Sequence, residues 1–368
     1  MNQPSSSEPE SESETSGQRV GVPPAQDAGA LERALFEVKR VIVGQDRLVE
    51  RMFVSLLARG HCLIEGVPGV AKTLAAETLA TVIGGQFARI QFTPDLVPAD
   101  IVGTRVYRPS SESFDVEPGP VFVNVLLADE INRAPAKVQS ALLEVMAERQ
   151  VTLAGQSRPV PDPFLVLATQ NPIEQEGVYP LPEAQRDRFL MKLLVGYPTD
   201  VEEREIIYRM GVAAPQASPV FGPAELRALQ GRADQVFVHN ALIDYTVRLV
   251  VATREPGRHG LADLAPLIQY GASPRASLGI VRASRALALL RGRDYVLPGD
   301  IADVAPDLLR HRLVLSYEAL ADDVPADHLI GRLLAVVPPP AVAPRQDAVP
   351  PAGQAAPHPV AAWPAAAG

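Results

Sequence analysis

HCLIEGVPGVAKT, residues 61–73, joins a short apolar run to a glycine-rich turn that ends in a lysine and a threonine. The apolar residues 61–65 predict a buried strand, and residues 73–83 predict a helix directly after the turn. A turn of this kind surrounds phosphate oxygens with backbone amides and a helix N-terminus. The stretch therefore indicates a nucleotide site in an α/β protein.

The turn follows the phosphate-binding pattern G-x-x-x-x-G-K-[ST] except at one position. Ala71 stands directly before the lysine, where the pattern has glycine. We expect Ala71 to lie already in the helix, where alanine is favourable and its methyl group can point away from the ligand. In this pattern Lys72 reaches the β- and γ-phosphates, and the hydroxyl of Thr73 binds Mg²⁺.

Two further apolar runs end in polar residues that suit catalysis. Residues 121–129 end in Asp129, which is followed by the adjacent carboxylate Glu130, and residues 164–169 are followed by Gln170 and Asn171. We expect Asp129 to hold Mg²⁺ and Glu130 to polarise the attacking water. Asn171 would hold that water beside the carboxylates. Each motif also occurs in ordinary turns, but their order along the chain favours the catalytic interpretation.

Residue composition and the periodicity of apolar residues along the 368 residues predict two folded parts between two tails. Residues 1–29 are acidic and serine-rich, and residues 338–368 contain nine prolines and eleven alanines, so both are expected to be disordered. Strands alternate with helices over residues 30–197, which predicts an α/β domain with a mainly parallel sheet. Residues 198–337 show helical periodicity. Residues 95–117 and 150–160 are predicted to be hairpin insertions.

Composition narrows the function further. A net charge of −9 argues against a protein that coats nucleic acid. No run approaches the ~18 apolar residues of a membrane span. The acidic N-terminal stretch differs from a signal peptide, so a cytoplasmic location is predicted. Cys62 is the only cysteine and lies in an apolar run, which predicts a buried structural thiol.

Five segments together resemble the MoxR family of AAA+ ATPases. They are GVPGVAKT (66–73), LLADEINRAPAKVQSALLE (126–144), ATQNP (168–172), LPEAQRDRF (181–189) and GASPRAS (271–277). The resemblance covers roughly residues 31–335. It implies a three-layer αβα P-loop NTPase domain with a parallel sheet, followed by an all-helical lid domain.

The resemblance also implies a role for each matching residue. Asn171 matches the sensor-1 position, Arg188 the arginine finger that reaches the neighbouring subunit's ATP, and Arg275 the sensor-2 arginine of the lid. Arg186 stands where the family often has an apolar residue, so the finger could be either arginine, with Arg188 preferred. Arg133 could contact the subunit interface. The residues expected to bind ATP are Val43, Gly44, Gln45, Gly66, Val67, Pro68, Gly69, Val70, Ala71, Lys72, Thr73, Leu74 and Asp129.

The function implied is that of a Mg²⁺-dependent ATPase in a ring, expected to be a hexamer. It would remodel, assemble or activate a partner protein complex in the manner of a chaperone, often together with a von Willebrand factor A domain protein. The two hairpin insertions would face the pore or the client. The alternatives are a nucleic-acid-dependent motor, which the net charge disfavours, and a slow ATP-gated switch, which Glu130 and Asn171 disfavour.

Overall fold

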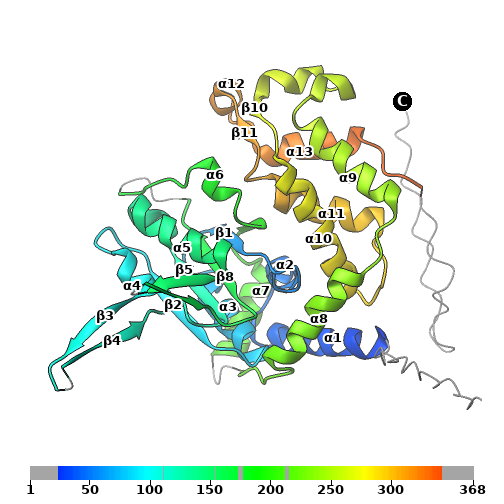
Figure 1. Cartoon of the computed structure of the whole chain (residues 1–368). Helices are drawn as coiled ribbons and strands as arrows, with labels where there is room; N and C mark the ends of the chain where they lie inside the picture. Colours follow the sequence, from blue (N-terminus) through cyan, green and yellow to red (C-terminus); the bar gives the residue numbers. More distant parts are fainter. Residues whose placement is uncertain (1–23, 111, 154, 173–176, 212–214, 342–368) are drawn as a thin grey trace, which may run out of the picture.

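A parallel sheet of five strands forms the centre of the first half of the chain (Figure 1). The computed structural model describes residues 24–341 apart from 111, 154, 173–176 and 212–214. The strands lie in the order β2-β5-β8-β1-β9 and every neighbouring pair is parallel. Their bounds are β1 Cys62–Gly66, β2 Phe87–Gln91, β5 Val125–Asp129, β8 Leu165–Gln170 and β9 Met191–Val195. The predicted α/β class is confirmed.

Helices cover both faces of this sheet, because its central strands are apolar on both sides. In β1, Cys62 and Ile64 belong to one buried cluster while Leu63 belongs to the other. The first cluster includes residues of α1 Pro24–Val41, α2 Asp46–Leu57 and α3 Lys72–Val82. The second includes residues of α4 Pro98–Val102 and α5 Ala136–Glu148. The result is three layers with all five strand ends on one edge.

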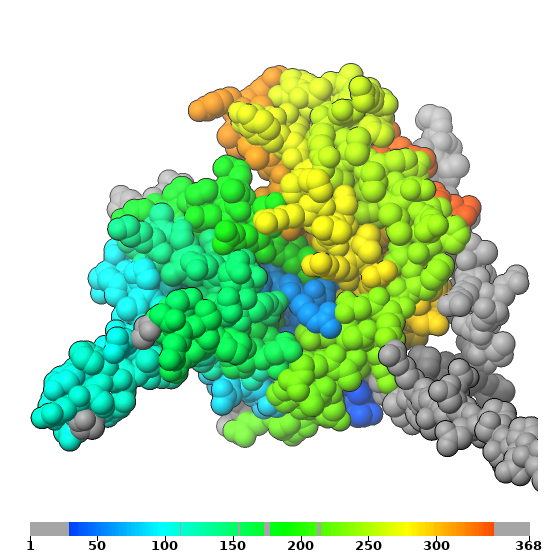
Figure 2. All heavy atoms as spheres, viewed as in Figure 1, coloured from blue at the N-terminus to red at the C-terminus, as the bar shows by residue number. Residues whose placement is uncertain are grey.

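Two antiparallel hairpins leave this core. The first pairs β3 Gly103–Arg108 with β4 Ser113–Pro118, and the second pairs β6 Gln150–Leu153 with β7 Gln156–Pro159. Figure 2 shows the first hairpin standing clear of the body as a cyan arm. Most of its side chains are exposed, including those of Tyr107 and Phe114.

The second part of the chain is mainly helical. It follows the end of β9 at Val195, and α7 begins at Asp200 with a capping box between Thr199 and Glu202. The helices are α7 Asp200–Met210, α8 Pro223–Gln235, α9 Asn240–Ala252, α10 Pro274–Leu290, α11 Pro298–Leu309, α12 Tyr317–Ala321 and α13 Ala326–Val336. A short antiparallel pair, β10 Ile268–Tyr270 with β11 Val314–Leu315, lies among these helices although only helices were expected.

Short elements complete the chain. They are α6 Glu183–Arg186 and the 3₁₀ helices Ile131–Arg133, Pro256–His259 and Ala262–Leu267. Disorder was expected through residue 29, but α1 begins at Pro24, since proline is compatible with the first turn of a helix. The rest of the predicted tails, residues 1–23 and 342–368, lies outside the described residues. Within the described part of the chain, every helix is too short or too polar to cross a membrane.

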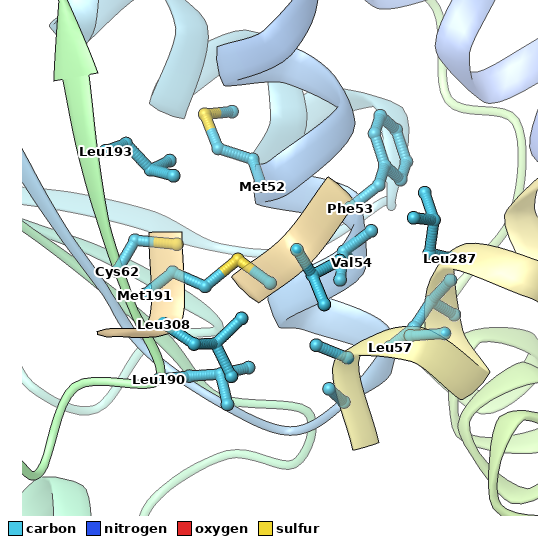
Figure 3. Close-up of a cluster of buried hydrophobic side chains, with 14 of the residues drawn as sticks. Met52, Phe53, Val54, Leu57, Cys62, Leu190, Met191, Leu193, Leu287 and Leu308 are labelled. Carbon is cyan, nitrogen blue, oxygen red and sulfur yellow. The ribbon is translucent and has the colours of Figure 1, made fainter. Parts of the chain in front are cut away.

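Helix α2 connects the sheet to the lid helices. Figure 3 shows Met52 and Phe53 of α2 in one apolar cluster with Leu193 of β9, Leu287 of α10 and Leu308 of α11. All five side chains are buried. The helical part therefore shares a continuous hydrophobic core with the α/β part.

Candidate active site

The glycine-rich turn is held closely against the sheet. Gly66 pairs with Val195 of β9, and a Cβ on Gly66 would lie 2.5 Å from the carbonyl oxygen of Val195. Gly69 has a φ of +82°, a conformation that favours glycine. The Nζ of Lys72 donates to the carbonyl oxygen of Gly66 at 2.6 Å. A side chain at position 66 would therefore clash with β9, whereas position 69 favours glycine because of its backbone conformation.

Ala71 departs from the expectation for this turn. Its backbone lies in the left-handed region, with φ 57° and ψ 22°, and α3 begins only at Lys72. The idea that Ala71 already belongs to the helix is therefore wrong. The loop needs the conformation that glycine adopts most easily, and alanine adopts it at a cost of roughly 1–2 kcal/mol.

Two adjacent strands position the carboxylates. The Thr169 hydroxyl of β8 donates to Oδ1 of Asp129 at 2.5 Å and accepts the backbone N–H of Glu130 at 2.9 Å. Thr169 is fully buried. Glu130 follows β5 in the left-handed region, with φ 56° and ψ 49°, so its carboxylate turns away from the strand direction. Thr169 was not among the predicted site residues. Its position near the end of the strand beside β5 is the sequence feature that could have identified it.

The end of β2 also contacts both carboxylates. Arg89 places Nη2 at 2.6 Å and Nε at 3.1 Å from Oδ2 of Asp129. Gln91 donates from Nε2 to Oε2 of Glu130 at 2.8 Å. Neither residue was among the predicted site residues, although their spacing of two on a strand places them on one face. Arg133 lies in this same site, because its Nε is 3.1 Å from Oε2 of Glu130.

Most of these groups line one pocket of about 430 Å³. Its lining residues are Pro68, Gly69, Val70, Ala71, Lys72, Thr73, Leu74, Arg89, Gln91, Asp129, Glu130 and Asn171. Burial lowers the pKa of Lys72, while the negative charges of Asp129 and Glu130 oppose this shift. The pocket thus joins a lysine, an arginine, a hydroxyl, two amides and two carboxylates from four separate segments.

The predicted adenine segment lies beside the base of this loop. Gln45 donates from Nε2 to the carbonyl oxygen of Gly196 at 3.0 Å. Gly196 follows Val195, the residue that packs against Gly66. Val43, Gly44 and Gln45 are not part of the pocket lining, and neither is Val67.

The two arginine-finger candidates and the predicted sensor-2 arginine do not line this pocket. Arg188 is exposed and lines a separate hollow of about 400 Å³ beside α5, and it forms no ion pair with any residue that the structure describes. Arg186 is paired with Glu183 of the same short helix at 3.3 Å. Arg275 is 62 % exposed, and its Nη1 lies 4.0 Å from Oδ2 of Asp187. Arg275 therefore lies near Asp187, the residue that precedes Arg188 in the chain.

A further arginine from the lid holds this segment. Arg312, after α11, donates from Nε to Oδ1 of Asp187 at 2.7 Å and from Nη2 to the carbonyl oxygen of Phe189 at 2.7 Å. The Ser273 hydroxyl donates to Oδ2 of Asp187 at 2.9 Å. Burial is the main cause that lowers the pKa of Arg312, and Asp187 opposes it. Arg312 belongs to no recognised motif and was missed from the sequence.

Comparison with known proteins agrees with this geometry. Residues 61–191 match the family model described as "ATPase family associated with various cellular activities (AAA)", and residues 262–333 match an AAA lid domain. Chaperone MoxR1 of Mycobacterium tuberculosis is 62 % identical over 94 % of this chain and 90 % of its own length. Protein MoxR of Paracoccus denitrificans is 37 % identical, over 82 % and 94 % respectively.

A solved structure is also similar. The crystal structure of a protein from Cytophaga hutchinsonii that is described as an ATPase superposes with a TM-score of 0.82 at 44 % identity. The match covers 86 % of this chain and 96 % of that one.

Proposed function

The chain belongs to the MoxR family of AAA+ ATPases, and on this premise we propose that it binds and hydrolyses ATP to remodel or activate a partner protein. The observation that carries this proposal is the convergence of Lys72, Asp129, Glu130 and Asn171 on one pocket. A pure nucleotide binder needs the lysine and the glycine loop, but it does not need a carboxylate beside the attacking water.

The donor set suits magnesium, because hydroxyl and carboxylate oxygens are its preferred protein ligands. Thr73 and Asp129 would hold the ion, which neutralises charge on the phosphate oxygens when bound. Lys72 binds the β- and γ-phosphates, and the loop amides hold the remaining oxygens. Glu130 takes the proton of the water whose oxygen bonds to the γ-phosphorus, while the bond from phosphorus to the β–γ bridging oxygen breaks. Asn171 orients that water.

The arginines act from a neighbouring copy in this proposal. Neither Arg188 nor Arg275 lines its own chain's pocket; Arg188 lies in a hollow beside α5 and Arg275 lies 4.0 Å from Asp187. A ring, expected to be a hexamer, would bring them to the next subunit's γ-phosphate, where Arg188 neutralises developing charge. Between the two candidate fingers, Arg188 is favoured because Arg186 is engaged with Glu183.

Two variants and their controls test the proposed reaction. Lys72→Ala should lose binding of a fluorescent ATP analogue, and Glu130→Gln should keep binding but release phosphate at least about 100-fold more slowly. Glu77→Gln, an exposed carboxylate on α3, controls for the charge change. Unchanged phosphate release by Glu130→Gln would favour the ATP-gated switch. Stimulation of the wild-type protein by DNA would favour the nucleic-acid motor.

The client is proposed to meet the two hairpins. On the first, the rings of Tyr107 and Phe114 pack in a tilted arrangement with centroids 5.1 Å apart, and Arg105 lies over the Phe114 ring at 4.7 Å. This exposed aromatic group suits a protein surface. The partner would carry a von Willebrand factor A domain, as the family resemblance implies. A Tyr107→Ser, Phe114→Ser variant that still captures such a partner with wild-type affinity, while its ATPase is intact, would contradict this role.

A further inference from the structure

Both oxygens of the metal-binding carboxylate are engaged by the protein itself. Oδ1 of Asp129 accepts the Thr169 hydroxyl at 2.5 Å, and Oδ2 accepts two nitrogens of Arg89 at 2.6 and 3.1 Å. A divalent cation that binds Asp129 must therefore share or displace one of these donors.

The two donors differ in their freedom to leave. Thr169 is fully buried between β5 and β1, and its hydroxyl also accepts the backbone N–H of Glu130. Arg89 lies on β2, at the edge of the sheet, and 47 % of its side chain is exposed. An exposed guanidinium can turn into solvent at little cost, whereas the hydroxyl cannot. Arg89 is thus the donor that gives way.

Gln91 links this contact to the catalytic carboxylate. Its Oε1 accepts from Nη2 of Arg89 at 2.8 Å, and its Nε2 donates to Oε2 of Glu130. The orientation of the amide follows from its partners, because a guanidinium only donates and a carboxylate only accepts. When Arg89 leaves, Gln91 loses the bond that fixes its amide against Glu130.

We propose that Arg89 is an internal cation that occupies Asp129 when no metal is bound and competes with Mg²⁺ for this carboxylate. The inference rests on the proposed function, since it takes Asp129 as the metal ligand. Arrival of the metal then displaces Arg89 and, through Gln91, loosens the contact on Glu130. The site keeps its carboxylates neutralised until the metal–nucleotide complex is present.

The test measures metal affinity rather than turnover. Free Mn²⁺ is titrated by electron paramagnetic resonance against the full-length chain with saturating ADP, and binding of a fluorescent ADP is measured separately in EDTA. Arg89→Met should bind Mn²⁺ about fivefold more tightly, because the competing ion pair is gone. Its affinity for ADP in EDTA should stay within about twofold of the wild-type value.

Arg133→Met is the matched control. It removes a guanidinium from Glu130 instead of Asp129, so it reports the general effect of a lost positive charge near the pocket. We expect it to change Mn²⁺ affinity less than about twofold. Circular dichroism checks folding, and Arg89→Gln, which is also neutral, replaces Arg89→Met if the latter fails to fold.

Three outcomes would overturn the inference. They are an unchanged or weaker Mn²⁺ affinity in the Arg89 variants, an equal gain in Arg133→Met, and a loss of metal-free ADP binding, which would make Arg89 a phosphate ligand. A wild-type chain that binds no nucleotide would instead refute the proposed function. The two failures are therefore distinguishable.

Discussion

At the scale of single residues, backbone conformation matters as much as side-chain chemistry in this site. Ala71 and Glu130 both have a positive φ, one directly before Lys72 and one at the proposed catalytic carboxylate. Such residues cost free energy and persist where the surrounding structure fixes them. Cys62 is different: it is fully buried, and burial is the main cause that raises its pKa to about 12, as expected of a structural thiol.

Because the backbone of Ala71 is strained, replacing alanine by glycine should have opposite effects on stability at this position and inside a regular helix. Ala71→Gly should raise the free energy of unfolding by up to about 1 kcal/mol, because relief of the left-handed conformation exceeds the extra backbone entropy of glycine. Ala228→Gly, at an exposed position inside α8, should lower it by about 1 kcal/mol. Urea unfolding measures both, and ATP turnover should persist in Ala71→Gly. A destabilised Ala71→Gly would show that the loop does not require this conformation.

At the scale of elements, buried polar side chains fix the amino ends of the strands. Asn124 accepts the N–H of Gln86, before β2, and donates to the carbonyl oxygen of Pro163, before β8. A strand was expected from residue 121, but β5 begins at Val125, directly after this residue. His61 does the same for β1. Its Nδ1 accepts the N–H of Val166, and its Nε2 contacts the carbonyl oxygen of Met146.

From the lowered pKa of His61 we predict that the free energy of unfolding decreases at acid pH. Burial, with a smaller effect of Arg149, lowers its pKa to about 3 in the folded protein, against 6.5 for the ordinary group. Between these values the unfolded chain binds more protons, so stability falls as pH drops from 6.5 toward 3. The slope from this site is about 1.4 kcal/mol per pH unit.

The measurement is urea unfolding from pH 7.5 to 5. His61→Gln should be less stable at neutral pH but should show a shallower pH dependence than the wild-type protein. His328→Gln, at an exposed histidine, controls for the substitution. An identical slope in His61→Gln and wild type would mean that His61 does not govern the acid response.

At the scale of the whole molecule, the core and the lid are joined by charge as well as by apolar packing. Arg51 of α2 is fully buried and contacts Asp303 and Asp307 of α11 at 2.6 and 2.9 Å. Arg312 makes a second connection, from the lid to Asp187 beside the candidate arginine finger. Movement of the lid would therefore shift both α2 of the α/β part and the surface that is proposed to meet the next subunit.

The buried connection should dominate stability. Arg51→Met should cost about 1–3 kcal/mol, because the buried Asp307 loses this partner but keeps Arg47 and Arg310. Arg59→Met removes an exposed pair with Asp234 and should cost less than about 1 kcal/mol. Thermal and urea unfolding compare the two. Equal losses would show that the Arg51 pair does not bind lid to core.

Assembly can be tested by mixing inactive subunits. Lys72→Ala lacks a working pocket and Arg188→Ala lacks the proposed finger, so each alone should hydrolyse ATP poorly. A mixture should regain activity, because an Arg188→Ala subunit keeps its pocket and receives Arg188 from a Lys72→Ala neighbour. Mixing Arg188→Ala with the double variant is the control. No recovery after verified co-assembly would assign the finger to Arg186 or place its action within one chain.

The sequence alone predicted the fold class and picked out loop and strand-end residues that the structure places around one pocket, because the loop motif and the strand-end carboxylates are each continuous in the chain and reflect local backbone geometry. Only the tertiary structure showed that the backbone of Ala71 adopts the left-handed conformation, since packing of β1 against β9 sets the path of the loop. It also decided which distant residues complete the site. Arg89 and Asp129 are 40 residues apart, and Arg312 and Asp187 are 125 apart. Those contacts depend on strand order and lid docking, which no local pattern encodes.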